Sequence, residues 1–389
     1  MTVTVLRAAW LFDGVSSTLR PNPVVVLDGA KIVAVDSDAA EGADIVDLPG
    51  ATLLPGMIDT HVHLAFDASS DPVGALAGRS DAEVVTAMRH AGLQALRSGV
   101  TTVRDLGDRD YLSLDVRGLP GMPTVVAAGP PITTPAGHCH YLGGGTQDVR
   151  AAVREHVERG CDVIKIMGSG GTLTPGTRQE EAQFTPEELR AAVDEAHRHG
   201  LPITAHAHGS QAIADAIAAG VDGMEHVSFW AADGVDDRPD LIEAIADRRI
   251  VVGATLGILP SDMPPPPPVA SRLGPMKACM RRLYEAGAPI VAGTDAGIAP
   301  VKPHNVLPYA VAQLRELGMS PSESLRAITS QAAGVCGLAH RKGRIAPGFD
   351  ADVIAVDGDP LADPTALLRI RAVHVGGANL SPAWSLGSI

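Results

Sequence analysis

Short apolar runs recur through the middle of the chain, and each is followed by a stretch with the spacing of an amphipathic helix. The runs that we interpret as strands cover residues 57–63, 101–106, 124–129, 162–167, 202–206, 221–226, 250–255 and 289–294. Helix starts between them are marked by Ser80, Thr185 and Ser320, each three residues before a Glu, which is the spacing of a capping box. Eight strands alternating with helices predict an α/β fold, a (β/α)8 TIM-type barrel over residues 55–341. The alternative is a doubly wound open sheet, but no Gly-rich phosphate turn follows the first run.

The two ends of the chain have a different pattern. Residues 1–54 contain short Val/Ile runs separated by the turn pairs Asp13-Gly14 and Asp28-Gly29, as in β-hairpins, and residues 342–389 repeat this texture. We therefore expect a small β-sandwich domain built from both termini. The segment 260–268 contains five consecutive prolines after the seventh run. It is either a stiff lid over the barrel mouth or an inert spacer.

Composition narrows the function classes. The formal net charge is −14, which argues against nucleic acid or an anionic membrane surface as a partner. The four cysteines are too far apart for a zinc-type pair or a disulfide framework. No apolar window has the length of a membrane span, and the first ten residues do not resemble a signal peptide. We expect a soluble protein of the reducing cytoplasm.

Histidines cluster at the ends of the predicted strands. His61 and His63 lie two apart, so both side chains face the same way in a strand, and His206 and His208 repeat this spacing. His226 ends the sixth run, and Asp295 follows the eighth. One such histidine is usually structural, but imidazole and carboxylate groups on four strands of one barrel mouth indicate zinc or another divalent metal.

Lys165 lies inside the apolar run Val163-Ile164-Lys165-Ile166-Met167, where both faces should be buried. An isolated buried ammonium is costly, so it either pairs with a carboxylate or loses its charge. A neutral Lys165 can react with carbon dioxide to form a carbamate, an anionic ligand with two oxygens that can bridge two metal ions.

These residues stand in motifs that resemble the amidohydrolase superfamily of metal-dependent hydrolases over nearly the whole chain. The motifs are Pro55-Gly56-Met57-Ile58-Asp59-Thr60-His61-Val62-His63, Lys165 in its strand, Ala205-His206-Ala207-His208-Gly209, Glu225-His226, Gly293-Thr294-Asp295 and the tail from Gly343 to Asp352. The texture is most similar to the group of Xaa-Pro dipeptidases, metallocarboxypeptidases and imidazolonepropionases.

The resemblance implies two divalent metal ions, with zinc expected. By motif position, the ligands are His61, His63 and Asp295 for one ion, His206 and His226 for the other, and carboxylated Lys165 between them. His208 is then a supporting or substrate-facing residue. The implied mechanism is attack by a metal-bridging hydroxide on a carbonyl, with Asp295 transferring the proton to the leaving nitrogen and His226 or His208 stabilising the oxyanion.

The function that we expect is hydrolysis of a C–N bond in a small substrate such as an N-acyl amino acid or a dipeptide. A cyclic amide of the lactam or imidazolone type, an ester or a carbamate is the alternative. Deaminases of the superfamily carry a Glu three residues after the fifth-strand histidine, where this chain has Gly209. A non-catalytic scaffold would show gaps among the ligands, and all six positions are filled.

Substrate contacts are expected from residues near the predicted strand ends. The loop after the third run is rich in His and Gly, and the few aromatic residues include two directly after the sixth. The candidates are His138, His140, Tyr141, Trp230 and His304. By resemblance to the family, we also expect a homo-oligomer.

Overall fold

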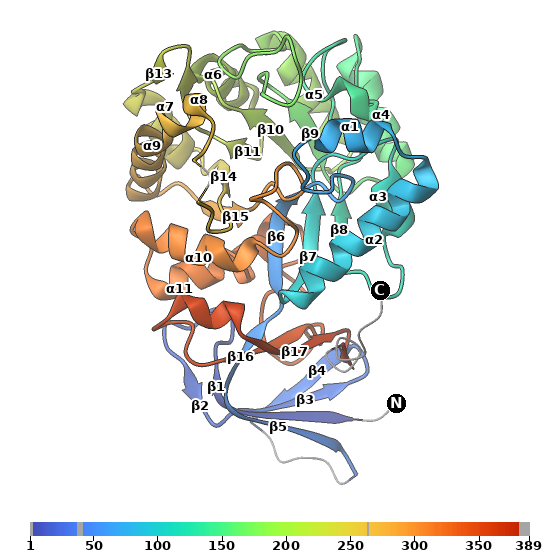
Figure 1. Cartoon of the computed structure of the whole chain (residues 1–389), viewed down its shortest axis with the longest axis vertical. Coiled ribbons are helices and arrows are strands. Elements are labelled where there is room, and N and C mark those ends of the chain that lie inside the picture. The colour runs from blue at the N-terminus through green and yellow to red at the C-terminus, as the bar shows by residue number, and fades with distance from the viewer. Residues whose placement is uncertain (1–2, 37–41, 263, 381–389) are drawn as a thin grey trace.

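The structure is a computed structural model that describes residues 3–36, 42–262 and 264–380 (Figure 1). Within these residues, each of the eight apolar runs of the central region forms a strand. The strands are β6 (Met57–Val62), β7 (Val100–Asp105), β8 (Thr124–Ala127), β9 (Ile164–Met167), β10 (Ile203–Ala207), β11 (Gly223–His226), β14 (Val251–Thr255) and β15 (Ile290–Gly293).

Parallel pairing joins these strands into two sheets, in the orders β6-β7-β8 and β15-β14-β11-β10-β9. Single parallel bridges, Val62 with Ala296 and Ile132 with Ile166, link the two sheets on either side. This is a TIM-barrel-like α/β fold. A continuous ladder around all eight strands is not found in the described residues. After β8 the chain passes through Pro130 and Pro131, which have no N–H to donate, before it reaches the bridge to β9.

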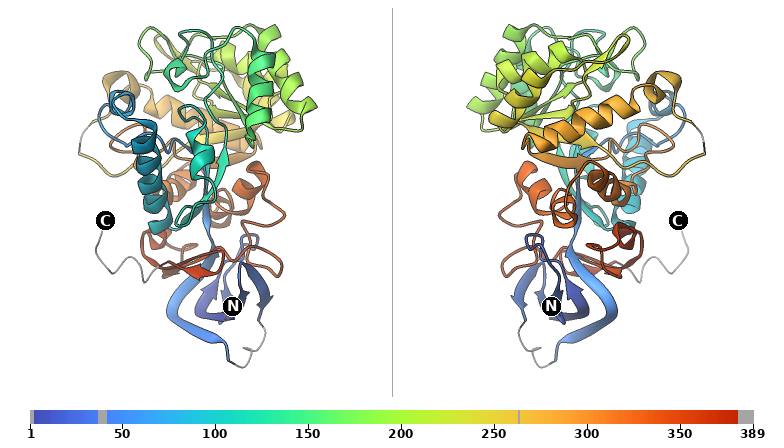
Figure 2. Two further views of the ribbon diagram at one scale, coloured as in Figure 1. Left: turned by 90° about the vertical axis from the view of Figure 1, so that its right-hand side faces the viewer. Right: turned by 90° about the vertical axis from the view of Figure 1, so that its left-hand side faces the viewer.

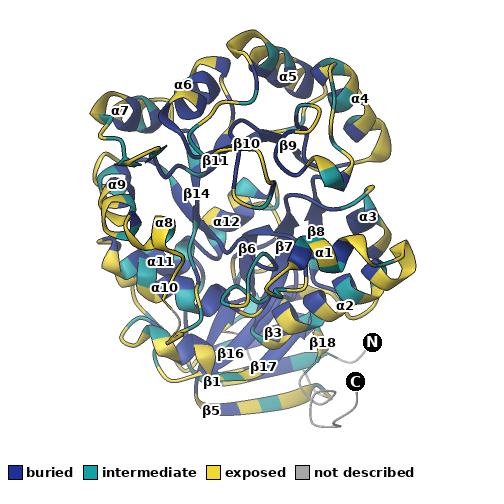
Figure 3. Ribbon diagram, turned by 45° about the horizontal axis from the view of Figure 1, so that its top comes forward, coloured by how far each residue is buried: buried dark blue, intermediate teal, exposed yellow. Residues whose placement is uncertain are grey.

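Helices surround the strands, and their inward faces are buried while their outward faces are exposed (Figure 3). In the described residues they are α1 (Pro72–Ala77), α2 (Asp81–Arg97), α3 (Leu112–Val116), α4 (Val149–Arg159), α5 (Pro186–Arg198), α6 (Ser210–Ala219), α7 (Pro239–Asp247), α8 (Pro267–Ala270), α9 (Leu273–Glu285), α10 (Leu307–Glu316), α11 (Pro321–Arg326) and α12 (Ser330–Val335), with 3-10 turns at His140–Leu142 and Pro364–Leu368. The expected capping boxes are present at the starts of α2, α5 and α11. In α5, for example, Glu188 accepts from the backbone N–H of Thr185 at 2.8 Å. No described helix is long and apolar enough to cross a membrane.

Strands from both ends of the chain form a further sheet below the barrel-like region (Figure 2). Its members are β1 (Thr4–Leu11), β2 (Arg20–Pro21), β3 (Val24–Asp28), β4 (Lys31–Val35), β5 (Asp44–Pro55), β16 (Val353–Asp357), β17 (Ile370–Val375) and β18 (Ala378–Asn379). The expected β-sandwich is not confirmed, because in the described residues these strands make one sheet rather than two. The 12-residue strand β5 pairs with β1 on one edge and β16 on the other, so it holds both ends of the chain together. Residues 37–41 and 381–389 of the expected domain lie outside the described residues.

The proline run forms part of the connection between β14 and α9, with α8 beginning at Pro267. Met263 within this segment is outside the described residues. All four cysteines are buried and none of them forms a disulfide in the structure.

Candidate metal centre

One cavity opens where the strands of the barrel-like region end, and it collects residues from both sheets. Its lining includes seven groups that can bind a metal or a carbonyl: His61, His63, Lys165, His206, His208, His226 and Asp295. The structure therefore brings together every residue that the sequence predicted as a metal ligand, together with His208.

His61, His63 and Asp295 form one group. The Nε2 atoms of His61 and His63 are 3.3 Å apart, and Asp295 Oδ1 lies 3.5 Å from the first and 3.2 Å from the second. Burial alone would raise the pKa of Asp295, but His61 and His63 beside it hold that pKa well below its usual range. A charged carboxylate facing two imidazoles is a donor set that suits a divalent first-row metal.

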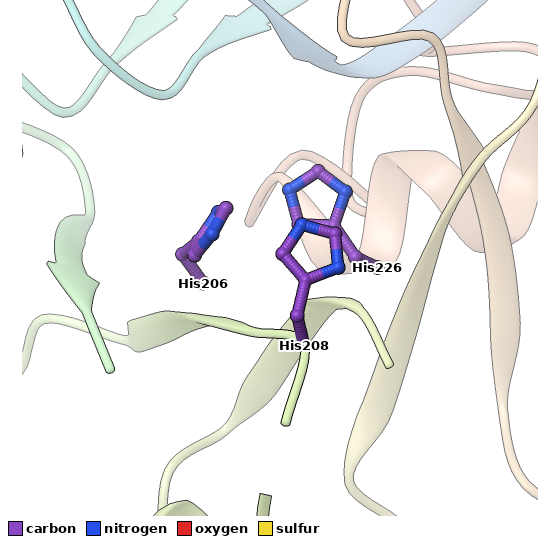
Figure 4. Close-up of side chains that lie close together, drawn as sticks. All are labelled: His206, His208 and His226. Atoms are coloured by element: carbon purple, nitrogen blue, oxygen red, sulfur yellow. The ribbon is translucent and has the colours of Figure 1, made fainter. Parts of the chain in front are cut away.

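His206, His208 and His226 form the second group (Figure 4). Their candidate ligand atoms all lie within 4.8 Å of one another, and the rings of His208 and His226 are stacked with centroids 4.4 Å apart. Burial lowers the pKa of His208 to about 3 and holds that of His206 well below its usual value. These imidazoles are thus neutral, which is the form that coordinates metals.

Each histidine of the two groups uses one ring nitrogen for a protein partner. Four contacts involve Nδ1: His61 with Glu225 Oε2 at 3.0 Å, His63 with Gly107 O at 2.9 Å, His208 with Ser228 Oγ at 2.7 Å and His226 with Thr255 Oγ1 at 3.1 Å. His206 uses Nε2, which lies 3.1 Å from Gly170 O. The second nitrogens of His61 and His63 face each other and Asp295, and that of His208 faces Gln179. In metal sites, an outer partner on one ring nitrogen orients the imidazole in the same way.

Lys165 fits the same site. It is 1% exposed, and its Nζ has no hydrogen-bond partner among the described residues, although it lines the cavity with the histidines and Asp295. Burial lowers the pKa of Lys165 to about 8, so a substantial fraction of the amine is neutral near pH 7 to 8. A buried amine without a partner thus lies beside the two groups of candidate metal-binding side chains.

The backbone is strained where two of these residues leave their strands. His226 has φ of 74° and Asp295 has φ of 59°, both in the left-handed region that non-glycine residues seldom occupy. Such conformations persist only where the surrounding structure enforces them, and they concentrate at functional sites. The turns at the ends of β11 and β15 therefore aim both side chains into the cavity.

The five expected substrate contacts are distributed unevenly. His138 is 4% exposed and lines the cavity, with its ring centroid 5.0 Å from that of His206. The other four are not among the residues that line it. His140 is exposed, Tyr141 packs against Cys139, Trp230 is covered by the guanidinium of Arg272 at 4.4 Å, and His304 Nε2 lies 3.0 Å from the carbonyl of Phe66.

Two residues of the site were absent from the sequence-based prediction. Gln179, in the long loop after β9, lines the cavity with its Nε2 3.4 Å from His208 Nε2. Arg104 lies inside β7, is 4% exposed and contacts Glu225 at 2.9 Å. An arginine in an apolar run is the same signal that singled out Lys165. No comparable signal marks Gln179, because only the fold of its loop places it at the cavity.

The fold and the site together define a class of enzyme, with an α/β barrel-like scaffold and histidine and carboxylate groups gathered where its strands end. Within that class the chain belongs to the amidohydrolase family, whose model matches residues 52–379. This family is typically metal-dependent, and the two groups described above are candidate metal sites in this chain. The protein is a hydrolase of C–N bonds.

Characterised relatives are similar over nearly the whole chain. Ochratoxinase of Aspergillus niger is 30% identical over an alignment that covers 96% of this chain and 85% of that protein. Imidazolonepropionase of Deinococcus deserti is 29% identical over 97% of this chain and 98% of that protein. A crystal structure of a Xaa-Pro dipeptidase with methionine in its active site has a TM-score of 0.84 at 26% identity and covers 97% of this chain and 99% of that one.

Proposed function

We propose that this amidohydrolase uses two divalent metal ions, with zinc expected, to cleave the amide or peptide bond of a small substrate. The observation that carries the proposal is the convergence of two groups, His61/His63/Asp295 and His206/His208/His226, on one cavity that also contains the unpartnered Nζ of Lys165. Seven such groups around one space are hard to explain by packing, because burying polar groups costs stability and the amine of Lys165 has no partner to offset that cost.

The assignment of ligands follows the two groups. We propose His61, His63 and Asp295 for one ion, His206 and His226 for the other, and Lys165 as a carbamate between them. In that reaction the neutral Nζ forms a bond to the carbon of carbon dioxide and loses a proton, which leaves an anion in place of an unpaired amine. His208 forms a hydrogen bond with Ser228 and lies close to Gln179. We assign it to contact with the substrate.

The protein groups have distinct tasks in the reaction. When bound, the ions supply Lewis acidity for the substrate carbonyl and an activated water. Asp295, already held as a carboxylate, accepts a proton from the attacking water as the C–O bond forms, and it donates that proton to the nitrogen as the C–N bond breaks. His208 or His226 stabilises the negative charge on the carbonyl oxygen.

The substrate class, a small amide such as an N-acyl amino acid or a dipeptide, is argued from the relatives. Similarity to ochratoxinase and to a Xaa-Pro dipeptidase supports an acyclic amide, whereas similarity to imidazolonepropionase supports a cyclic amide as the second candidate. Ester or carbamate hydrolysis would use the same chemistry. The buried, unpaired cysteines support our expectation of a cytoplasmic location.

Deamination is disfavoured by Gly209. Deaminases of this superfamily place a proton-shuttling Glu at the corresponding position. A Cβ at Gly209 would lie only 2.8 Å from Glu180 Cα, and closer still to the Glu180 carbonyl. No side chain fits there without moving the loop after β9, so this site has no room for such a shuttle.

Metal analysis and a turnover screen test the proposal. Protein produced with zinc and bicarbonate should contain about two ions per chain and should hydrolyse at least one of a panel of N-acyl amino acids, dipeptides, lactams, esters and carbamates. Activity should disappear with a chelator and return only when metal and bicarbonate are both supplied. Full activity in protein freed of metal would overturn the proposal.

A further inference from the structure

A buried carboxylate contacts one of the candidate metal ligands from outside the cavity. Glu225, the residue before His226 in β11, is 1% exposed and is not among the residues that line the cavity. Its Oε2 accepts from His61 Nδ1 at 3.0 Å, while its Oε1 accepts from Arg104 at 2.9 Å and from Thr204 at 2.9 Å. Both carboxylate oxygens of Glu225 therefore accept hydrogen bonds, and only Oε2 contacts His61.

The contacts form a closed path between strands that lie on different sides of the barrel-like region. Arg104, on β7, donates from Nη2 to Glu225 and from Nε to the carbonyl of Thr60 at 2.6 Å, next to His61 on β6. The Glu225 carboxylate is thus held in place by side chains of two other strands, Arg104 of β7 and Thr204 of β10.

A glycine on the neighbouring strand leaves space for the Glu225 carboxylate. A Cβ on Gly253 of the neighbouring strand β14 would lie 2.7 Å from Glu225 Cδ, and nearer still to Oε2. Any larger residue at 253 would therefore push the carboxylate away from His61.

We infer that Glu225, held in place by Arg104, is a positioning residue that keeps the hydrogen of His61 on Nδ1 and directs Nε2 toward His63 and Asp295. The inference rests on the proposed function, because it concerns the ion that His61, His63 and Asp295 would bind. A hydrogen bond from Nδ1–H to a carboxylate fixes the ring and makes the opposite nitrogen a stronger ligand.

Removing both members of the ion pair together separates its effect on metal binding from its effect on folding. Replacing a buried ion pair with apolar side chains of similar size is often neutral for stability, whereas removing one partner is costly. The double variant Arg104→Met/Glu225→Leu removes both charges and leaves His61 Nδ1 without its acceptor. It should keep the melting temperature of the metal-free protein but bind one ion more weakly.

The test measures zinc affinity by competition with a coloured chelator, with metal-free melting temperature as the check on folding. We expect Glu225→Gln, Gly253→Ala and the double variant each to lower the zinc affinity of one of the two sites by about 10- to 100-fold. Glu195→Gln is the matched control, because Glu195 is also fully buried beside arginines, Arg150 at 3.3 Å and Arg154 at 3.4 Å, but lies on α5, facing α4.

Since Glu225 directly precedes His226, double variants decide which ion is affected. The effect of Glu225→Gln should be largely absent in a His63→Ala background and fully present in a His206→Ala background. If the wild type binds two ions and all three changes leave both affinities at the wild-type value, the inference is wrong while the proposed function stands. If the wild type binds no zinc, the proposed function fails and the inference fails with it.

Discussion

The ammonium of Lys302 donates to the backbone carbonyl of Thr294 at 2.7 Å, immediately before Asp295, and to the carbonyl of Thr255 at 3.1 Å. These two carbonyls lie at the ends of β15 and β14, where Asp295 turns into the left-handed region. Lys302 thus joins two neighbouring strand ends directly behind a candidate ligand. It was not among the residues singled out in the sequence.

Replacing Lys302 with Met should lower both stability and turnover. Loss of two hydrogen bonds from a charged donor should reduce the free energy of unfolding by about 1–3 kcal/mol. Because the turn at Asp295 loses its support, we also expect a fall in kcat. Urea denaturation and steady-state kinetics measure the two effects. Lys277→Met, which removes an exposed pair with Glu316, is the control and should change stability by less than about 0.5 kcal/mol.

Replacing Lys165 with Met should separate stability from metal binding. The metal-free variant should be more stable than metal-free wild type by about 1–3 kcal/mol, because a buried amine without a partner is removed. Metal content and turnover should fall sharply, because the proposed bridging group cannot form. Denaturation in the presence of a chelator and metal analysis provide the measurements. Retention of two ions and of full turnover would show that Lys165 is not a ligand.

Asp295→Asn tests the proton-transfer role. The amide can still accept one interaction near His61 and His63, so metal content should be largely kept. It cannot accept and return a proton, and turnover should fall by about 10²-fold or more. Metal analysis and kinetics on the same preparation distinguish the two effects. Near-normal turnover would exclude Asp295 as the general base and acid.

Gln179→Ala tests whether the loop after β9 contributes to substrate binding. Removal of the polar side chain that this loop places beside the His208 ring should raise KM by about 10-fold, equivalent to 1.4 kcal/mol of lost binding. The change in kcat should be smaller. Gln94→Ala, at an exposed position on α2, is the control. A change in kcat with constant KM would instead place Gln179 in the chemical step.

Asp350→Asn should destabilise the small sheet at neutral pH. Asp350 contacts Lys31 at 2.9 Å and Lys342 at 3.3 Å, and a hydrogen bond from Arg341 reaches it at 2.7 Å. Burial alone would raise the pKa of Asp350, but these cations lower it below 3.8. The carboxylate therefore stabilises the folded state above the unfolded pKa, and this contribution is lost as pH falls through the lower folded value.

Urea denaturation of Asp350→Asn and the wild type at several pH values tests this expectation. The difference in unfolding free energy should be about 1 kcal/mol near pH 7 and should narrow below about pH 4. A difference that stays constant across this range would mean that the contacts of Asp350 do not depend on its charge.

The strands and the candidate ligands were accessible from the sequence because each carries a local signal. A polar residue at the end of an apolar run, such as His206 or Asp295, needs no knowledge of distant residues. The division of the strands into two sheets was not predicted, since it depends on where Pro130 and Pro131 fall relative to β9. The single sheet of both termini depends equally on long-range pairing, that of β5 with β16.

Substrate contacts were harder to predict because loops do not follow the two-residue alternation of strands. His138 and His140 appeared equivalent, but Cys139 between them has φ of 59°, and a 3-10 turn begins at His140. The chain therefore changes direction, so that His138 lines the cavity and His140 is exposed. Trp230 was expected to contact substrate because it is one of few aromatic residues. In the structure its ring packs against Arg272, which lies 42 residues further along the chain, and no local pattern reveals such a contact.

The position of β5 constrains the order in which the chain can fold. This strand ends at Pro55, and a single residue separates it from β6. Pro55 pairs with Val353, which lies almost 300 residues later in the chain. During synthesis, one edge of β5 stays unpaired until nearly the whole chain has emerged, and unpaired edges promote aggregation. Termination shortly before β16 would leave every candidate metal ligand present but the strand leading into His61 open along one side. Nascent chains of this protein are therefore expected to depend on chaperones until their last strands are made.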